Sequence, residues 1–290
     1  MFLSTRELAE LKAPLTRRKW ALQERLLSRR IVHFSATELV WQCRQQLLCE
    51  CDFSDLDNTW YMNNYNAALV SGNSSLKEDQ WSLVVSTYTR ADITNKNDTL
   101  PAIAGLARVY GASGLGRYHA GLWNSMLPGA LCWRTSKNHS HLKGLSVSDP
   151  TWRSVVCRRA EQYVAPTWSW ASVVGSVDFA WNSSMKTVAR VVNVKCTSVN
   201  GDDYGRLAAG YIEIEAHVHR STSEWPPGHD FRFDTFDDLK VAREASHSAF
   251  ALIALGGRSL RARSYGIALA ARDDVDYCAE FGEKRILKIL

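Results

Sequence analysis

Cysteine and histidine side chains gather at two places where they could hold a metal ion. The two sets are His33, Cys43, Cys49 and Cys51, and the pair His217 and His219. Zinc sites are usually built on paired Cys-x-x-Cys or His-Glu-x-x-His spacings, and neither set has one. We therefore expect no metal site, and interpret the cysteines as reduced thiols, mostly in the core, and the histidines as surface residues.

A glycine-rich stretch from Gly111 to Gly116 has the composition of a loop that could surround a phosphate group. Such loops follow a strand and open a helix, because the backbone N–H groups at a helix N-terminus hold the anion. Here the stretch follows an expected helix, so it indicates a helix end. The chain also lacks the Gly-x-Ser-x-Gly motif that exposes a nucleophilic serine.

The chain has eleven tryptophans, and two of them are spaced for a common role. Trp168 and Trp170 would lie on one face of an extended segment, where a sugar or a base could stack on them. Alternatively, both indoles fill the core at a junction between helices and a sheet, with each N–H bonded to a carbonyl. We favour the junction, with Pro166 starting an extended segment.

Composition excludes several classes of protein. With 290 residues, 46% hydrophobic and 22% charged, the chain can bury a sizeable core and is not disordered. The net charge of +5 is spread over short basic runs, which are typical of solvated faces, so we do not expect nucleic-acid binding. The longest apolar stretch, 249–255, is too short to cross a membrane, and we expect a cytoplasmic protein without a signal peptide.

Helical signals dominate the first half. A capping box at 4–7 and a helix at 16–28 are followed by two short strands, 31–34 and 39–41. Residues 44–77 indicate a long surface excursion. Three helices are then predicted from apolar spacing: one with Trp81, Val84, Val85 and Tyr88; one with Ile103, Leu106, Ala107 and Tyr110, capped by Asp98; and one with Leu122, Trp123, Met126 and Leu127.

Strand signals dominate after Pro166. The five candidates are 188–194, 211–218, 249–255, 265–271 and 285–290. The alternation in 211–215 predicts a strand with one face in solvent. The sequence therefore predicts an α+β fold: N-terminal helices with a short hairpin, a mainly helical region at 44–164, and an antiparallel β-rich region at 165–290.

Several stretches, taken in order, resemble one known family. They are KWALQERLLS at 19–28, IVHF at 31–34 with LVWQC at 39–43, DTLPAIAGLA at 98–107 after the Trp81 helix, YHAGLW at 118–123 with LCWR at 131–134, and APTWSWASV at 165–173. This series resembles the end and the continuation of fungal heterokaryon-incompatibility (HET) domain proteins. The residues that carry the likeness are Trp41, Cys43, Pro101, Trp123, Trp133, Pro166, Trp168 and Trp170.

The opening segments of HET domains, similar to "ALSYVWG" and "DALCINQ", have no counterpart here. We therefore expect residues 1–43 to be a remnant of the end of a HET domain. The resemblance implies a role in heterokaryon incompatibility and programmed cell death. For this chain we expect a truncated, non-catalytic scaffold that binds other protein chains, an incompatibility partner or a second copy.

The same resemblance suggests an enzymatic alternative. HET domains are thought to be related to TIR domains, whose NAD-cleaving members carry a glutamate four residues after a tryptophan. Trp20 and Glu24 have this spacing, so they would share a helix face. A carboxylate there would stabilise an oxocarbenium-like state, as in glycosidases. An ordinary surface pair of Glu24 with a neighbouring arginine is the simpler interpretation, and NAD is expected as a cofactor only for an intact HET domain.

The third alternative is a carbohydrate- or nucleic-acid-binding module built on Trp168 and Trp170.

Overall fold

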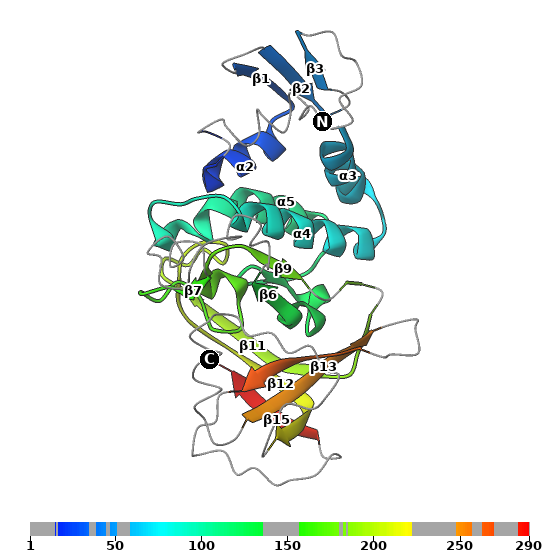
Figure 1. Ribbon diagram of the computed structural model, residues 1–290, viewed down its shortest axis with the longest axis vertical. Coiled ribbons are helices and arrows are strands. Elements are labelled where there is room, and N and C mark those ends of the chain that lie inside the picture. The colour runs from blue at the N-terminus through cyan, green and yellow to red at the C-terminus, as the bar shows by residue number, and fades with distance from the viewer. Residues whose placement is uncertain are drawn as a thin grey trace, which may run out of the picture.

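The computed structural model describes residues 15, 17–34, 39–44, 47–50, 59–135, 157–179, 182–183, 185–221, 248–256, 263–269 and 284–289. Over these residues the protein has the predicted α+β fold, with its helices early in the chain and antiparallel strands at both ends. Figure 1 shows the arrangement along the long axis. A small sheet lies at one end, the main helices lie in the middle, and the largest sheet lies at the other end.

The N-terminal part consists of one helix and the small sheet. Helix α2 (Lys19–Leu27) leads into β1 (Arg30–Phe34), β2 (Leu39–Cys43) and β3 (Leu47–Cys49), which pair antiparallel in that order. The predicted helix and hairpin are therefore confirmed. The capping box at residues 4–7 lies outside the described residues.

The surface excursion predicted for 44–77 is wrong. This part of the chain contains β3, helix α3 (Thr59–Val70) and the start of helix α4 (Ser74–Thr89). The polar residues that indicate a loop cap a helix instead, since the side chain of Asn73 accepts a hydrogen bond from the backbone N–H of Ser75 at 2.9 Å. Ser, Asn and Asp favour both turns and helix N-caps, so composition alone does not separate the two.

The two predicted apolar helix stripes are confirmed. The side chains of Trp81, Val84, Val85, Tyr88, Ile103, Leu106, Ala107 and Tyr110 are all fully buried. The capping role of Asp98 is wrong, because Asp98 ends a short 3-10 helix, η1 (Lys96–Asp98). A second one, η2 (Pro101–Ile103), follows before helix α5 (Ala104–Ala112) begins.

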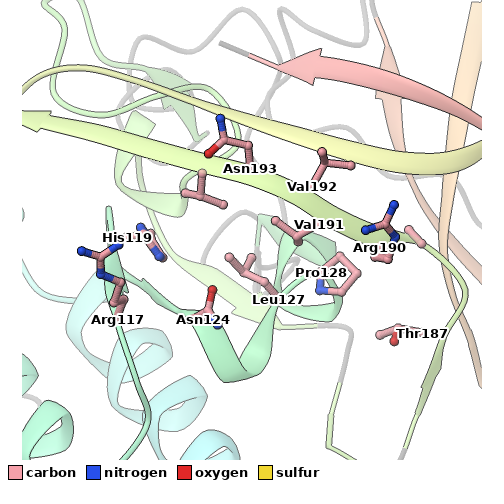
Figure 2. A pocket seen from close by; sticks show the side chains of 12 residues that line it. Arg117, His119, Asn124, Leu127, Pro128, Thr187, Arg190, Val191, Val192 and Asn193 are labelled. Carbon is pink, nitrogen blue, oxygen red and sulfur yellow. The ribbon is translucent and has the colours of Figure 1, made fainter.

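The helix predicted around residues 122–127 is wrong. Strands β4 (Tyr118–His119) and β5 (Leu122–Trp123) form a hairpin there, followed by η3 (Asn124–Met126) and η4 (Gly129–Cys132). The hairpin turn consists of Ala120 and Gly121, with φ of 50° and 96°. Two positive φ values are the mark of the tight turn that best matches strand twist, and this turn overrides the helical spacing of the apolar residues. In Figure 2, His119 of β4 lies on one side of a cleft, and residues 190–193 lie on the other side.

Short strand pairs connect the helices to the large sheet. They are β6 (Trp133–Thr135) with β9 (Val177–Phe179), and β7 (Arg158–Arg159) with β8 (Val173–Val174). The extended segment predicted from Pro166 is wrong, since a turn and the 3-10 helix η6 (Trp170–Ser172) occupy it. Ser169 begins η6 as its cap, accepting a hydrogen bond from the N–H of Ala171.

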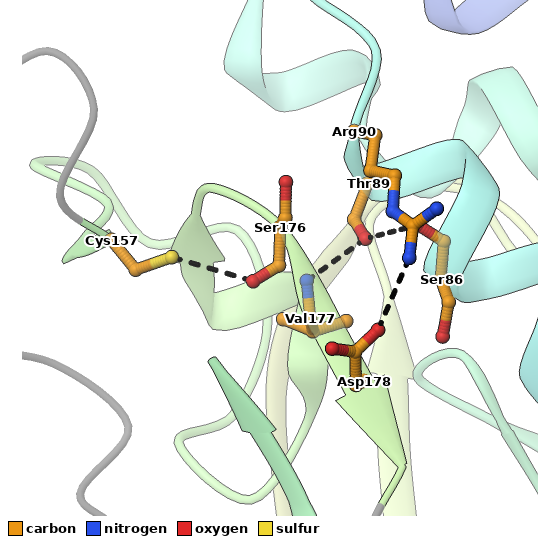
Figure 3. Close-up of polar contacts among 7 residues, drawn as sticks. All are labelled: Ser86, Thr89, Arg90, Cys157, Ser176, Val177 and Asp178. Atoms are coloured by element: carbon orange, nitrogen blue, oxygen red, sulfur yellow. Dashed lines mark hydrogen bonds and ion pairs between the residues drawn. The ribbon is translucent and has the colours of Figure 1, made fainter. Parts of the chain in front are cut away.

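Polar contacts join the end of α4 to β9 (Figure 3). The hydroxyl of Thr89 accepts a hydrogen bond from the N–H of Val177 at 3.0 Å and donates to the carbonyl of Ser86. Next to it, Arg90 and Asp178 form an ion pair at 3.6 Å. These contacts hold the helical layer against the strands that follow it.

The large sheet contains the five predicted strands, with their bounds shifted by a few residues, and one short additional strand. Its members are β10 (Lys186–Thr187), β11 (Arg190–Ser198), β12 (Leu207–Ser221), β13 (Ser248–Gly256), β14 (Arg263–Leu269) and β15 (Lys284–Ile289). The order is β10-β13-β12-β11, with β14 paired to β13 and β15 paired to β12. The predicted alternation in β12 is confirmed, because Ile212 and Ile214 are fully buried whereas Glu213 and Glu215 are partly exposed.

A single cluster of buried residues runs from α2 through the helices and the short strands to the large sheet. It includes Leu26 of α2, Trp81 of α4, Trp170 of η6 and Ile214 of β12. The division into three segments stays a prediction, but the described core is continuous across its boundaries.

Candidate functional site

One backbone turn lies at the centre of the buried core. The carbonyl of Gly121 accepts hydrogen bonds from the indole N–H groups of both Trp81 and Trp170, each at 3.0 Å. The adjacent carbonyl of Ala120 accepts one from the hydroxyl of Ser169 at 2.5 Å. Three segments far apart in the sequence therefore meet at the β4–β5 turn.

The tryptophans and prolines that carry the family likeness are mostly structural in this arrangement. Trp168 and Trp170 are 3% and 1% exposed, so neither indole offers a face on which a ligand could stack. The expected N–H bond to a carbonyl is confirmed for Trp170 but wrong for Trp168, whose indole N–H has no partner among the described residues. Trp133 is buried beside them and donates its indole N–H to the carbonyl of Trp168 at 2.8 Å. Trp123 is fully buried and lies 5.6 Å from Trp81, ring centre to ring centre, in an edge-to-face contact.

The remaining residues of this set lie in separate elements. Pro101 opens η2, Pro166 is buried, and Trp41 and Cys43 are half-buried on β2.

The proposed catalytic pair of α2 does not come together at a cleft. Trp20 is half-buried and packs against the core, whereas Glu24 is exposed to solvent. The cleft shown in Figure 2 is lined by other elements, β4, η3 and β11. Glu24 does not line this cleft.

The metal-ligand candidates are dispersed. The ring of His33 hydrogen-bonds to the side chain of Gln42, and His217 is half-buried on β12. Cys51 and the side chains of Cys49 and His219 lie outside the described residues. Within the described part of the chain, no three His, Cys, Asp or Glu residues lie close enough to hold a metal ion.

The described cysteines are free thiols: Cys43, Cys132, Cys157 and Cys196. Burial raises the pKa of Cys132 to about 12, and burial together with nearby Asp203 raises that of Cys196 to about 12. Both therefore stay protonated at neutral pH and are poor nucleophiles. None of the helices that the structure describes is long and apolar enough to cross a membrane.

The outer face of the small sheet is the most unusual surface of the described chain. Residues opposite each other in an antiparallel pair share a face, and Phe34 pairs with Leu39 while Val32 pairs with Trp41 and Trp41 with Leu48. Four of the five are exposed: Val32 by 44%, Phe34 by 83%, Leu39 by 37% and Leu48 by 42%. We call these four residues the outer face.

The opposite face of the same sheet is better covered and carries Ile31, His33, Val40 and Gln42. Gln42 is only 3% exposed, and its carbonyl oxygen accepts a hydrogen bond from the Nε of Arg25 at 3.1 Å and contacts Nε2 of His33 at 2.9 Å. This network joins the sheet to α2. Sheets with one solvated face normally point polar side chains outward, whereas this sheet exposes four apolar side chains and buries Gln42. We call this arrangement the inversion of the sheet.

Exposed basic residues lie at one end of the outer face, opposite the end that carries Phe34 and Leu39. Arg29, Arg30 and Arg44 are all exposed, and Arg30 lies on the same side of β1 as Val32 and Phe34. Glu50 is also exposed, but its carboxylate already accepts a hydrogen bond from the N–H of Leu39 at 2.8 Å. The outer face is therefore apolar with a rim that is positive at one end.

Helix α2 connects this sheet to the helical core. Lys19 is buried with its ammonium group 4.9 Å from the centre of the Tyr88 ring. Burial, reinforced by nearby Lys96, lowers the pKa of Lys19 to about 8, while Asp92 partly opposes the shift. The side chain of Lys19 therefore lies where α2 meets the helical core.

The inversion was missed in the sequence because alternation is identical for either orientation of a strand. Only the position of α2 against Gln42 decides which face is covered. Comparisons of the chain with protein-family profiles, characterised proteins and solved structures gave no match.

Proposed function

We propose that this chain is a non-catalytic interaction scaffold of the heterokaryon-incompatibility type. It binds a partner protein through the outer face of the β1–β3 sheet. The observation that carries the proposal is the inversion of that sheet, with Gln42 buried on one side and Phe34 83% exposed on the other. Contiguous apolar surface with a polar rim is typical of protein-interaction sites.

The charge of the rim favours a different protein over a second copy of this chain. A symmetric dimer that packs the arginine-bearing ends of two sheets together would juxtapose like charges, which oppose association. A partner segment with alternating apolar and acidic side chains satisfies both the face and the rim. Among the residues that the structure describes, β1 and β3 are the edges of this sheet, and their outer sides offer backbone groups to such an extended segment.

A labelled peptide of alternating leucine and glutamate tests this recognition, with a leucine–lysine peptide as the charge control. We expect fluorescence anisotropy to show binding of the acidic peptide only. Phe34→Ser should weaken binding about tenfold or more, as expected for an aromatic residue central to an interface. Val70→Ser is the matched control, because Val70 is 87% exposed on α3, away from the sheet.

Three outcomes would contradict the proposal. Equal loss of binding in Phe34→Ser and Val70→Ser would mean that general apolar exposure is measured. Concentration-dependent dimerisation in sedimentation, abolished by Phe34→Ser, would assign the face to a second copy. Tighter binding to anionic lipid vesicles than to the peptide, again dependent on Phe34, would assign it to a membrane surface.

The cellular role needs a separate experiment. Expressed in a fungal strain competent for incompatibility, a non-catalytic scaffold competes for the partner, so we expect less cell death after hyphal fusion. The Phe34→Ser chain should have no such effect at equal expression. An undiminished death response with the unaltered chain would argue against the incompatibility role, even if peptide binding holds.

A further inference from the structure

A cleft of about 520 Å³ lies on the other side of the helical core, between the β4–β5 hairpin and strand β11. Polar side chains are grouped at one end of it: Arg117, His119 and Asn124 from the hairpin and η3, and Asn193 from β11 (Figure 2). Apolar side chains form its floor: Leu127, Pro128 and Val191. The cleft therefore has a polar end and an apolar surface beside it.

The hairpin directs two nitrogen-bearing side chains into this end. Arg117 and His119 are two positions apart on an extended segment, so they share a face, while Tyr118 between them points into the core. Tyr118 packs against Trp123 and Tyr204, with ring centres 5.0 Å from each. The core thus fixes the strand, and the strand fixes Arg117 and His119.

Strand β11 is irregular where it borders the cleft. Val191 pairs with Ile214 and Asn193 pairs with Glu213, so Val192 is an extra residue in a β-bulge. Bulges reorient neighbouring side chains and are common beside binding sites. Asn193 donates its side-chain N–H to the hydroxyl of Tyr211 at 3.1 Å, which holds its amide in place.

The two arginines among the described residues that line the cleft differ in whether their charge is paired. Arg190 is paired with Glu215 at 3.0 Å, so its charge is already matched. The guanidinium of Arg117 has no hydrogen bond or ion pair to any residue that the structure describes, and it is exposed to solvent. Arg117 can therefore donate a two-pronged hydrogen bond to an incoming oxyanion.

His119 lies next to Arg117 and is buried. Burial first, and then the positive charge of Arg117, lowers the pKa of His119, while the negative charge of Asp203 opposes the shift. The imidazole is therefore neutral at pH 7 and presents an N–H donor beside the guanidinium. A bound anion would offset the charge of Arg117 and favour protonation of His119.

The geometry points to a binding site for a small organic oxyanion. Its anionic oxygens contact Arg117 and His119, and its apolar body lies on Leu127, Pro128 and Val191. A charged head next to an apolar floor selects an organic acid over an inorganic ion, because the floor contributes only when an apolar group covers it.

Benzoate is a suitable probe, with neutral benzamide and inorganic phosphate as matched ligands, and calorimetry as the measurement. We expect saturable binding of benzoate, with both controls weaker by about tenfold or more. Arg117→Gln should weaken benzoate binding about tenfold or more. Lys195→Gln removes the same charge from an exposed β11 position outside the cleft, and should change affinity by less than about twofold.

The pH dependence gives a second readout. Benzoate stays charged between about pH 5.5 and 8, so any change of affinity in that range belongs to the protein. We expect binding to strengthen as pH falls and His119 takes up a proton, and this dependence to disappear in His119→Gln. Absence of saturable benzoate binding, equal binding of benzamide or phosphate, or equal losses in Arg117→Gln and Lys195→Gln would overturn the proposal.

Discussion

The β4–β5 turn and the β1–β3 sheet differ in where they place large apolar side chains. At the turn, two indoles and a serine hydroxyl are buried, and each donates to a backbone carbonyl. At the sheet, a glutamine is buried while valine, leucine and phenylalanine face solvent. The difference separates residues that stabilise the fold from residues that remain available to a partner. Substitutions of the buried tryptophans should therefore lower stability, whereas substitutions on the outer face should leave stability unchanged and weaken partner binding.

The largest effect on stability is expected in the segment around Trp170, which packs on the turn. Trp168→Ala and Trp170→Ala each remove a buried indole and should lower the free energy of unfolding by about 3–5 kcal/mol, a large share of a typical total of about 5–15 kcal/mol. Urea denaturation of the purified variants measures this loss. The matched sheet variant, Phe34→Ala, should stay within about 0.5 kcal/mol of the parent.

That comparison can fail in two ways. If both tryptophan variants melt within a degree of the parent, the turn is not a structural junction, and ligand stacking on the indoles becomes the better explanation. If Phe34→Ala is as destabilising as Trp170→Ala, the outer face belongs to the core of the free protein.

The next largest effect on stability is expected at Lys19, where α2 meets the helical core. Lys19 has a pKa of about 8 in the folded protein against 10.5 for an ordinary lysine. Between these values the unfolded chain binds a proton that the folded chain does not, so folding becomes more favourable as pH rises from about 8 to 10.5. The gain is about 3 kcal/mol at most. Lys19→Met should lack it.

Denaturation of both proteins at a series of pH values isolates this contribution, since the other lysines and tyrosines are common to both. Parallel stability curves from pH 7 to 11 would mean that Lys19 is solvated and that α2 does not hold it against Tyr88.

A smaller effect is expected on the polar side of the sheet. Gln42→Ala removes the acceptor shared by Arg25 and His33 and leaves both donors without it. A lost buried hydrogen-bond partner costs about 1–3 kcal/mol. Thermal melting should report this, while Gln42→Glu keeps an acceptor and should lose less. Unchanged melting in Gln42→Ala would remove the structural reason for the inversion.

The smallest effect is expected at Glu24. Because its carboxylate is exposed, Glu24→Gln should change stability by less than about 0.5 kcal/mol. The unaltered chain should release no nicotinamide from NAD above a blank. Release that Glu24→Gln abolishes would restore the enzymatic alternative and set aside the non-catalytic scaffold.

Patterns of burial were predictable wherever one period dominated a segment. The stripe from Trp81 to Tyr88 and the alternation around Ile212 were both identified because their apolar spacing matches a helix and a strand. Helix α3 was missed because its apolar residues are interrupted by polar ones, and Tyr65 is buried only through contact with other helices, including the ring of Tyr110.

The two surfaces could not be predicted for a different reason. Arg117 and Asn193 are far apart in the sequence, and they border one cleft only because the core places β4 beside β11. The outer face depends on which side of the sheet α2 covers, and strand alternation carries no such information. The helical spacing of Leu122 and Met126 was overridden by two left-handed residues, which a pattern of apolar side chains does not reveal.

The carbonyl of Gly121 also determines how the molecule opens. One oxygen accepts both indole protons, so movement of the hairpin away from the core breaks both hydrogen bonds at once. The three segments should behave as one cooperative unit in hydrogen exchange. The indole protons of Trp81 and Trp170 would then exchange with solvent at the same slow rate, and the two resonances would report a single opening event.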